Sequence, residues 1–321
     1  MGKLVAPPVE TAESTIHFPM EGQFFESLTE AHLRHALTPR ELAAFQRDGY
    51  LVVPGALDEA TRFRLLEATD RLDGRERQRL ELGRGDMMSR FSVIRFDPAF
   101  LELVAWAPTV PKVWDILGWN IQLYISHLVV YPPETWGGQQ CRAPVWHQDS
   151  GRPVLELERP APRLSVKVAY WLTDTHGPDR GAMEVIPGSH RLDAPPPECD
   201  DPDWDGRLLL EASPGDAVIF DRRIWHRHGR NSSDVVRKAL FFGYSYRWLR
   251  ALDYTAMPEA LLERCDPVLR QLLGDGATEV GWYQPQPEDV PLRAWLAARI
   301  GEEGLWQPPS SQPQQRLTPR E

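Results

Sequence analysis

The sequence predicts a mainly β protein, a sandwich or jelly roll, with a helical N-terminal third packed against the β body. Three observations carry this prediction. The 30 prolines are spread through the middle of the chain, where they break long helices and favour short strands and loops. From about residue 121 the chain becomes a series of short runs rich in β-branched and aromatic residues, separated by Gly, Pro and Asp or Asn. Before that point the apolar residues follow the spacing of helices.

The elements of the N-terminal third follow one another with recognisable boundaries. Residues 1–25 are expected to be a flexible arm. Thr38 is a plausible N-cap with Pro39 behind it, and Asp48-Gly49 ends the first helix. The run "YLVVPG" predicts a short buried strand, and Asp58 caps a second helix. Residues 98–118 predict helix interrupted by prolines.

The second part of the chain is expected to form the jelly-roll core, over about 121–250. Its strands are predicted in "IQLYISHLVVYPP", "LSVKVAYWLTD", "GAMEVIPGS", "GRLLLEASPGDAVIFD" and "RKALFFGYSYRW". C-terminal helices follow, with one over 288–300. We expect a single domain over 26–304 and a flexible Pro/Gln/Ser-rich arm over 305–321.

Bulk composition excludes several classes of function. The 321 residues carry a net charge of −10 without a basic run, which argues against a nucleic-acid partner. The sequence has neither a secretory signal pattern nor an apolar stretch near ~20 residues, so we expect no membrane partner. Three distant cysteines fit neither a disulfide framework nor a zinc finger, so a cytoplasmic protein is expected. Composition leaves a monomer and a homodimer equally open.

The stretch "PVWHQDSGRP" places His147 and Asp149 on the same face of a strand. A third ligand is available 79 positions after His147, at His226, or at His228 on the same strand face. Two imidazoles and one carboxylate form the facial triad of non-haem Fe(II) oxygenases, which leaves three metal positions open. Arg237 opens the next strand, and its guanidinium can bind the distal carboxylate of a 2-oxo acid in a bidentate pair.

These residues and their surroundings resemble the phytanoyl-CoA dioxygenase family of Fe(II)/2-oxoglutarate-dependent oxygenases. The matching stretches are "WHQDS", "GAMEVIPGSHR", "GDAVIFDRRIWHRHGRNSSDVVRKALFFGYSYRW" and, near the N-terminus, "LTPRELAAFQRDGYLVVPGALD". The resemblance implies a double-stranded β-helix, the cupin-like form of the jelly roll. It also implies a metal site with a catalytic role made of His147, Asp149 and His226, with 2-oxoglutarate on Arg237.

The same resemblance selects between the two candidate histidines. The family has Asn five positions and Arg eleven positions after its metal-binding His, and from His226 these positions are Asn231 and Arg237. His228 then falls near the co-substrate. The resemblance further places two other side chains, His127 and Tyr170, beside 2-oxoglutarate.

The function we expect is hydroxylation of an unactivated C–H bond in a small-molecule metabolite or natural-product intermediate. The co-substrates would be 2-oxoglutarate and O2, with succinate and CO2 as products and Fe(II) as the metal. Asp149 favours hydroxylation, because halogenases of this type lack that carboxylate. Desaturation and cyclisation stay open. So do two other readings: a catalytically silent jelly-roll binding protein, and a zinc-dependent hydrolase or lyase using the same His/Asp/His site.

Overall fold

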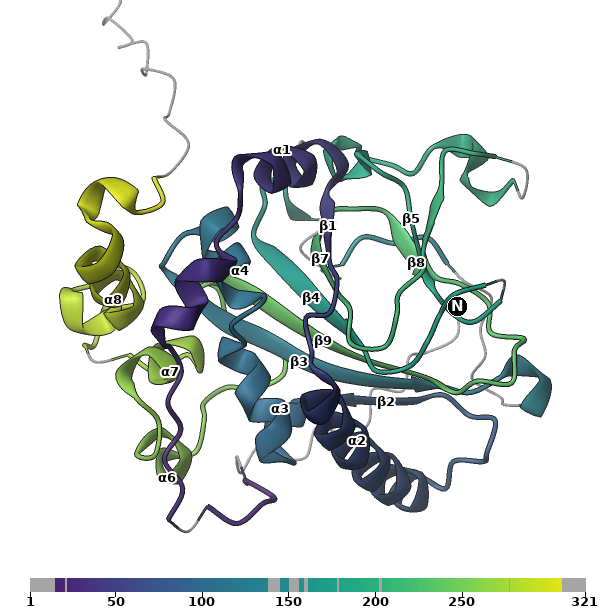
Figure 1. The fold of residues 1–321 in the computed structure, drawn as a ribbon, viewed down its shortest axis with the longest axis horizontal. Coiled ribbons are helices and arrows are strands. Elements are labelled where there is room, and N and C mark those ends of the chain that lie inside the picture. The colour runs from purple at the N-terminus through teal and green to yellow at the C-terminus, as the bar shows by residue number, and fades with distance from the viewer. Residues whose placement is uncertain are drawn as a thin grey trace, which may run out of the picture.

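A computed structural model gives the fold of the chain (Figure 1). It describes residues 15–20, 22–137, 145–149, 156–158, 161–177, 179–201, 204–276 and 278–307. None of the helices in this part of the chain is long and apolar enough to cross a membrane.

Nine strands form two antiparallel sheets in the described part of the chain. The larger sheet has the order β1-β7-β4-β9-β3-β2 and the smaller one β6-β5-β8. The strands are β1 (Tyr50–Val53), β2 (Met88–Phe91), β3 (Ile121–Tyr131), β4 (Ser165–Trp171), β5 (Met183–Val185), β6 (Leu208–Leu210), β7 (Ala217–Asp221), β8 (His226–His228) and β9 (Arg237–Tyr246). The predicted runs after residue 121 are therefore strands, whereas β2 was not predicted.

Helices cover one face of the larger sheet, and the smaller sheet packs on its other face (Figure 1). The helices are α1 (Pro39–Asp48), α2 (Glu59–Leu80), α3 (Pro98–Glu102), α4 (Val110–Leu117), α6 (Glu259–Leu262), α7 (Pro267–Leu272) and α8 (Pro291–Ile300). Of these, α1, α2, α4 and α7 contact strands of the larger sheet, and α8 packs on α7. The chain is thus mainly sheet with flanking helices, as expected.

The predicted helix boundaries of α1 and α2 are confirmed at their caps. The Thr38 side chain accepts a hydrogen bond from the Glu41 backbone N–H, and Gly49 ends α1 with a φ of 83°. Asp58 accepts from the Thr61 backbone N–H at the start of α2. A side chain that satisfies a free N–H at a helix start stabilises the helix by ~1 kcal/mol, so the sequence signal has a physical basis in both places.

Two local expectations were wrong. β1 is an edge strand that pairs with β7 alone, and its Val52 is 36% exposed, so it is not a buried strand. The described part of the predicted N-terminal arm packs on the body: Phe25 is buried and forms a parallel bridge with Cys265. A β-branched run predicts a strand without saying whether its second edge is covered. A backbone bridge between Phe25 and Cys265, 240 positions apart, has no local sequence signature.

The two faces of the larger sheet bury different residues. Alternate side chains of β4 point to opposite faces: Val166, Val168 and Tyr170 join the core beneath the helices, while Ala169 and Trp171 join the core between the two sheets. The space between the sheets is where the candidate site lies.

Candidate metal centre and its cavity

An isolated antiparallel bridge brings His147 and His226 together. The backbone N–H of each of these two histidines donates to the backbone carbonyl of the other, both at 3.0 Å. Their ring centroids lie 4.3 Å apart. Residues 79 positions apart in the sequence thus become cross-strand neighbours, because β8 continues from the turn after β7 to meet the 145–149 segment.

Both imidazoles are oriented in the same way. The Nδ1 of His147 is 2.9 Å from the carbonyl of Val145, and the Nδ1 of His226 is 2.9 Å from the carbonyl of Ile224. A carbonyl oxygen accepts only, so each Nδ1 carries the proton and each Nε2 presents a lone pair. This is the arrangement in which metal-binding histidines are usually held.

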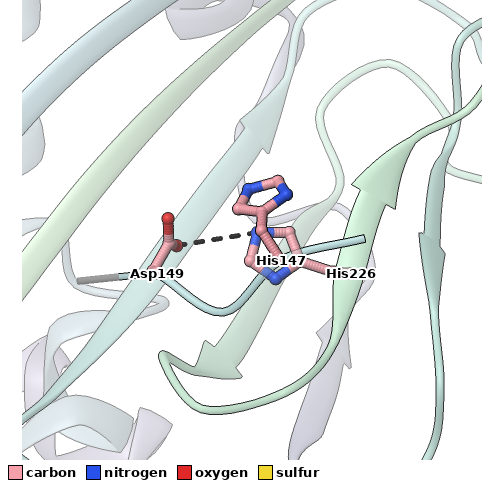
Figure 2. Close-up of side chains that lie close together, drawn as sticks. All are labelled: His147, Asp149 and His226. Carbon is pink, nitrogen blue, oxygen red and sulfur yellow. Dashed lines mark ion pairs between the residues drawn. The ribbon is translucent and has the colours of Figure 1, made fainter. Parts of the chain in front are cut away.

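Asp149 completes the cluster (Figure 2). Its backbone N–H donates to the Arg222 carbonyl at 2.9 Å, which fixes the residue beside the turn that leads into β8. One ligand atom from each of His147, Asp149 and His226 lies within 4.8 Å of the other two. Among the described residues, these three side chains form a group spaced closely enough to hold one metal ion.

The charges around this cluster favour a bound cation. Burial alone would raise the pKa of the Asp149 carboxyl, but the Lys167 ammonium and the two imidazoles hold it below its ordinary value. Burial, with His147 next, lowers the pKa of His226 to about 4. At neutral pH the site therefore offers an ionised carboxylate and a neutral His226 imidazole, the protonation states that metal binding requires.

The cluster opens on a cavity of about 580 Å³ between the two sheets. Arg237 lies in the same cavity at the start of β9, as predicted from the sequence, and is 4% exposed. Its Nη1 donates to the Gly181 carbonyl at 3.0 Å, while its buried Nε has no hydrogen-bond partner among the described residues. Burial lowers the pKa of Arg237 to about 10, which leaves it charged at neutral pH.

No described carboxylate pairs with Arg237, and its surroundings are aromatic. The guanidinium carbon lies 5.2 Å from the Tyr131 ring centroid and 5.6 Å from that of Trp171. Gly181 has a φ of +72°, and a Cβ at this position would lie 3.2 Å from the Arg237 Cδ. A buried guanidinium with a free donor and no counter-charge is expected to bind an anion.

His228 and His127 also line the cavity. The His228 ring meets the edge of Tyr131 at a centroid distance of 5.2 Å, so it lies at the Arg237 end. His127 is hydrogen-bonded to Ser89 at 2.8 Å and stacks on Phe91 at 4.2 Å. Burial lowers the pKa of His127 to about 3, so its imidazole is neutral.

Tyr170 does not line the cavity, so its predicted contact with 2-oxoglutarate is wrong. Its hydroxyl shares a 2.6 Å hydrogen bond with Thr109 in the core beneath the helices. The error is one of strand parity: Tyr170 and its neighbour Trp171 point to opposite faces of the sheet, and it is Trp171 that faces the cavity.

Several cavity residues were missed by sequence reasoning. Two of them are charged. The Lys167 Nζ lies 2.7 Å from the Asp149 Oδ2, and the Arg227 guanidinium is paired with Glu184 at 2.9 Å. A lysine in the centre of the apolar strand "LSVKVAYWL" was a signal that could have found it, because an unpaired lysine is rarely buried. The remaining missed residues are apolar or small, and include Met87, Phe91, Tyr124, Ile125, Met183, Phe241 and Leu252.

The fold and the cluster together define a dioxygenase family. Residues 45–239 match the family model described as phytanoyl-CoA dioxygenase (PhyH). The chain belongs to the phytanoyl-CoA dioxygenase family.

Two relatives are similar to this chain over much of its length. The uncharacterized protein Rv1501 of Mycobacterium tuberculosis is 27% identical over 251 residues, covering 73% of this chain and 83% of the relative. An ectoine dioxygenase of Nocardia farcinica is 25% identical over 235 residues, covering 64% of this chain and 76% of the relative.

Solved structures share the fold. HygX from Streptomyces hygroscopicus, with nickel and 2-oxoglutarate bound, superposes with a TM-score of 0.55 at 18% identity, covering 67% of this chain and 90% of that one. SnoK, a non-heme alpha-ketoglutarate-dependent carbocyclase from nogalamycin biosynthesis, has a TM-score of 0.51 at 20% identity, covering 65% and 84%.

Proposed function

We propose that the protein is an Fe(II)/2-oxoglutarate-dependent dioxygenase that hydroxylates a C–H bond of a small molecule, on a double-stranded β-helix core. The observation that supports this most is the combination in one cavity of a His/Asp/His cluster and a buried arginine without a described carboxylate partner. A zinc-dependent hydrolase or lyase does not need that arginine.

The donor set fits iron(II). Two imidazole nitrogens and one carboxylate oxygen leave open metal positions, and the two backbone carbonyls already hold both Nε2 atoms free of protons. His147, Asp149 and His226 would hold the ion. Bound iron would supply the chemistry with dioxygen, in which 2-oxoglutarate, O2 and R–H become succinate, CO2 and R–OH.

The residues of the chain bind and orient the reactants. Arg237 would bind the distal carboxylate of 2-oxoglutarate by charge-assisted hydrogen bonds, which its free Nε can supply. The rings of Trp171 and Tyr131 pack around the Arg237 guanidinium and would shield this carboxylate from water. His228 and His127 are proposed to contact the co-substrate from the neighbouring walls, His228 beside Arg237 and His127 from β3.

The neighbours suggest the kind of substrate. HygX has been solved with hygromycin B, and SnoK comes from nogalamycin biosynthesis. We therefore propose a free metabolite or a natural-product intermediate, which a cavity of about 580 Å³ can hold beside the co-substrate.

The test is metal-dependent turnover. Protein stripped of metal is reloaded with Fe(II) or Zn(II), and succinate formed from 2-oxoglutarate is measured with a panel of candidate metabolites in chloride-containing buffer. We expect succinate with Fe(II) and none with Zn(II), and its loss in Asp149→Gly, because one of three metal ligands is removed. Turnover with Zn(II), or a chlorinated product from the unaltered protein, would contradict the hydroxylase assignment.

A further inference from the structure

Lys167 is a buried charge that the proposed mechanism does not use. It sits in the centre of β4, is 9% exposed, and extends into the cavity. Its ammonium lies 2.7 Å from the Asp149 Oδ2, which is the ion pair recorded for it in the described part of the chain. Lysine is almost never buried without a partner, so a role for a buried lysine beside the metal ligands has to be found.

Lys167 and Arg237 lie toward opposite ends of the cavity. On β9, Trp171 is paired with Ala239, next to Arg237, whereas Lys167 is paired with Gly243. Arg237 and Gly243 are six residues apart, roughly 20 Å of strand. The co-substrate carboxylate expected on Arg237 therefore leaves the Lys167 end of the cavity for another ligand.

The metal site competes with Lys167 for its partner. The same Oδ2 atom of Asp149 that pairs with Lys167 also faces the Nε2 of His226, at 3.7 Å. A divalent cation bound by these ligands draws on the charge of that carboxylate and repels the nearby ammonium. Loading the metal thus leaves Lys167 with only part of its counter-charge, and an unpaired buried charge is costly.

A count of charges in the cavity also indicates that a positive charge is left without a partner. Among the described residues that line the cavity, Lys167 and Arg237 are cations and Asp149 is an anion, while Arg227 is tied to Glu184 at 2.9 Å. These three side chains without another partner sum to one excess positive charge. Fe(II) and the dianion of 2-oxoglutarate cancel each other, so the loaded site keeps that excess.

The walls beside Lys167 are apolar and lead to the surface. Gly243 is paired with both Lys167 and Ile125, so these two side chains lie in one row across β9. Tyr124 is next to Ile125, and the backbone N–H of Leu252 donates to its carbonyl at 2.7 Å. Leu252 is 61% exposed and lines the cavity, so this end of the cavity reaches the surface.

We propose that Lys167 binds an acidic group of the substrate, and that the substrate is therefore an organic anion with an apolar body. This inference rests on the proposed function, because it needs the metal to take Asp149. It assigns the Arg237 end to the co-substrate and the Lys167 end to the substrate.

The experiment uses two fluorescent probes of one skeleton. Anilinonaphthalene sulfonate carries an anionic group, and phenylnaphthylamine lacks it. Both are titrated anaerobically into protein loaded with Fe(II) and 2-oxoglutarate. Variant Lys167→Met removes the charge at similar length. Lys112→Met is the matched control, because Lys112 is also buried and paired with a carboxylate, Glu41 at 2.8 Å, outside the cavity.

We expect Lys167→Met to weaken the sulfonate probe about tenfold or more, the value of one charge-assisted hydrogen bond. The neutral probe should bind both proteins alike, Lys112→Met should leave both probes unchanged, and Lys167→Arg should restore much of the sulfonate affinity. An equal loss of both probes would overturn the proposal, as would a loss of 2-oxoglutarate affinity with the probes unaffected, which would place Lys167 on the co-substrate.

A second measurement needs no variant. In the unaltered protein, adding Fe(II) and 2-oxoglutarate should raise the affinity for the sulfonate probe and not for the neutral one, because Lys167 is released from Asp149. Equal changes for both probes would contradict the proposal. The absorbance band of an Fe(II)–2-oxoglutarate complex is recorded in the same samples. If that band is missing, the proposed function fails, and Lys167-dependent sulfonate binding is judged separately.

Discussion

The imidazoles of His147 and His226 are each fixed by the carbonyl two positions earlier in the chain. This local geometry explains why His-x-Asp is informative at the scale of single residues. The expected strand is reduced to an isolated bridge at His147, with Asp149 in the turn that follows, and the two side chains still converge. The carbonyl of Val145 then selects the tautomer that binds metal. Spacing and ligand type in the sequence predict His147 and Asp149, whereas the choice of His226 over His228 came from the family resemblance.

The choice between His226 and His228 gives the first prediction. His226→Ala should lose Fe(II) binding, since a facial site loses one of three ligands. His228→Ala should keep it, because His228 lies toward Tyr131 and Arg237. Equilibrium dialysis of Fe(II) under anaerobic conditions measures both. Metal retained in His226→Ala and lost in His228→Ala would reverse the assignment of the ligand.

Charge partners were harder to predict than ligands. Lys167 and Asp149 are eighteen positions apart, and their 2.7 Å contact depends on how β4 lies against the 145–149 segment. No local pattern encodes such a contact. Only the lysine's placement among apolar residues of a strand gave a hint.

At the scale of elements, strand parity decides which residues reach the cavity. The sequence located β4 correctly, but Tyr170 and Trp171 are both large aromatics, so composition does not say which face is which. The structure buries Tyr170 against Thr109 on one face and Trp171 between the sheets on the other. A shift of one residue in the strand would exchange the two. Helix caps had no such ambiguity, which is why α1 and α2 begin where expected.

Two variants test which of Tyr170 and Trp171 faces the cavity. Tyr170→Phe should leave 2-oxoglutarate affinity unchanged and lower the free energy of unfolding by about 1–2 kcal/mol, through the lost hydrogen bond to Thr109. Trp171→Phe should weaken 2-oxoglutarate roughly threefold, because the larger ring packs on the Arg237 guanidinium. Urea unfolding and 2-oxoglutarate titration separate the two effects. Weakened co-substrate binding in Tyr170→Phe alone would show that the parity is wrong.

At the scale of the whole molecule, the start of the described chain is tied to the region after the sheet. Phe25 forms a backbone bridge with Cys265, and the Ser27 hydroxyl donates to Asp266 at 2.8 Å. Asp266 in turn caps α7 by accepting from the Leu269 N–H. These contacts join residues more than two hundred positions apart, so they lie beyond what local sequence patterns can predict.

The tie should contribute to stability. Phe25→Ala should lower the free energy of unfolding by about 3–5 kcal/mol, as for other buried phenylalanines. Phe24→Ala is the matched control, because Phe24 is 58% exposed, and its effect should stay within about 0.5 kcal/mol. Urea denaturation compares them. Equal and small losses would mean that residues 22–25 do not belong to the folded body.

The central claim joins all three scales. A His/Asp/His site for one metal ion and a buried arginine share the cavity between two facing sheets and bind 2-oxoglutarate there. The most direct measurement is an anaerobic titration of 2-oxoglutarate into Fe(II)-loaded protein, followed by the metal-to-ligand charge-transfer absorbance. Removing one partner of a buried charge pair costs ~3–5 kcal/mol. Arg237→Ala should therefore weaken 2-oxoglutarate by roughly a hundredfold or more while Fe(II) still binds, and Arg237→Lys should recover part of the affinity, since the charge remains without the fork. Unchanged affinity in Arg237→Ala would contradict the account.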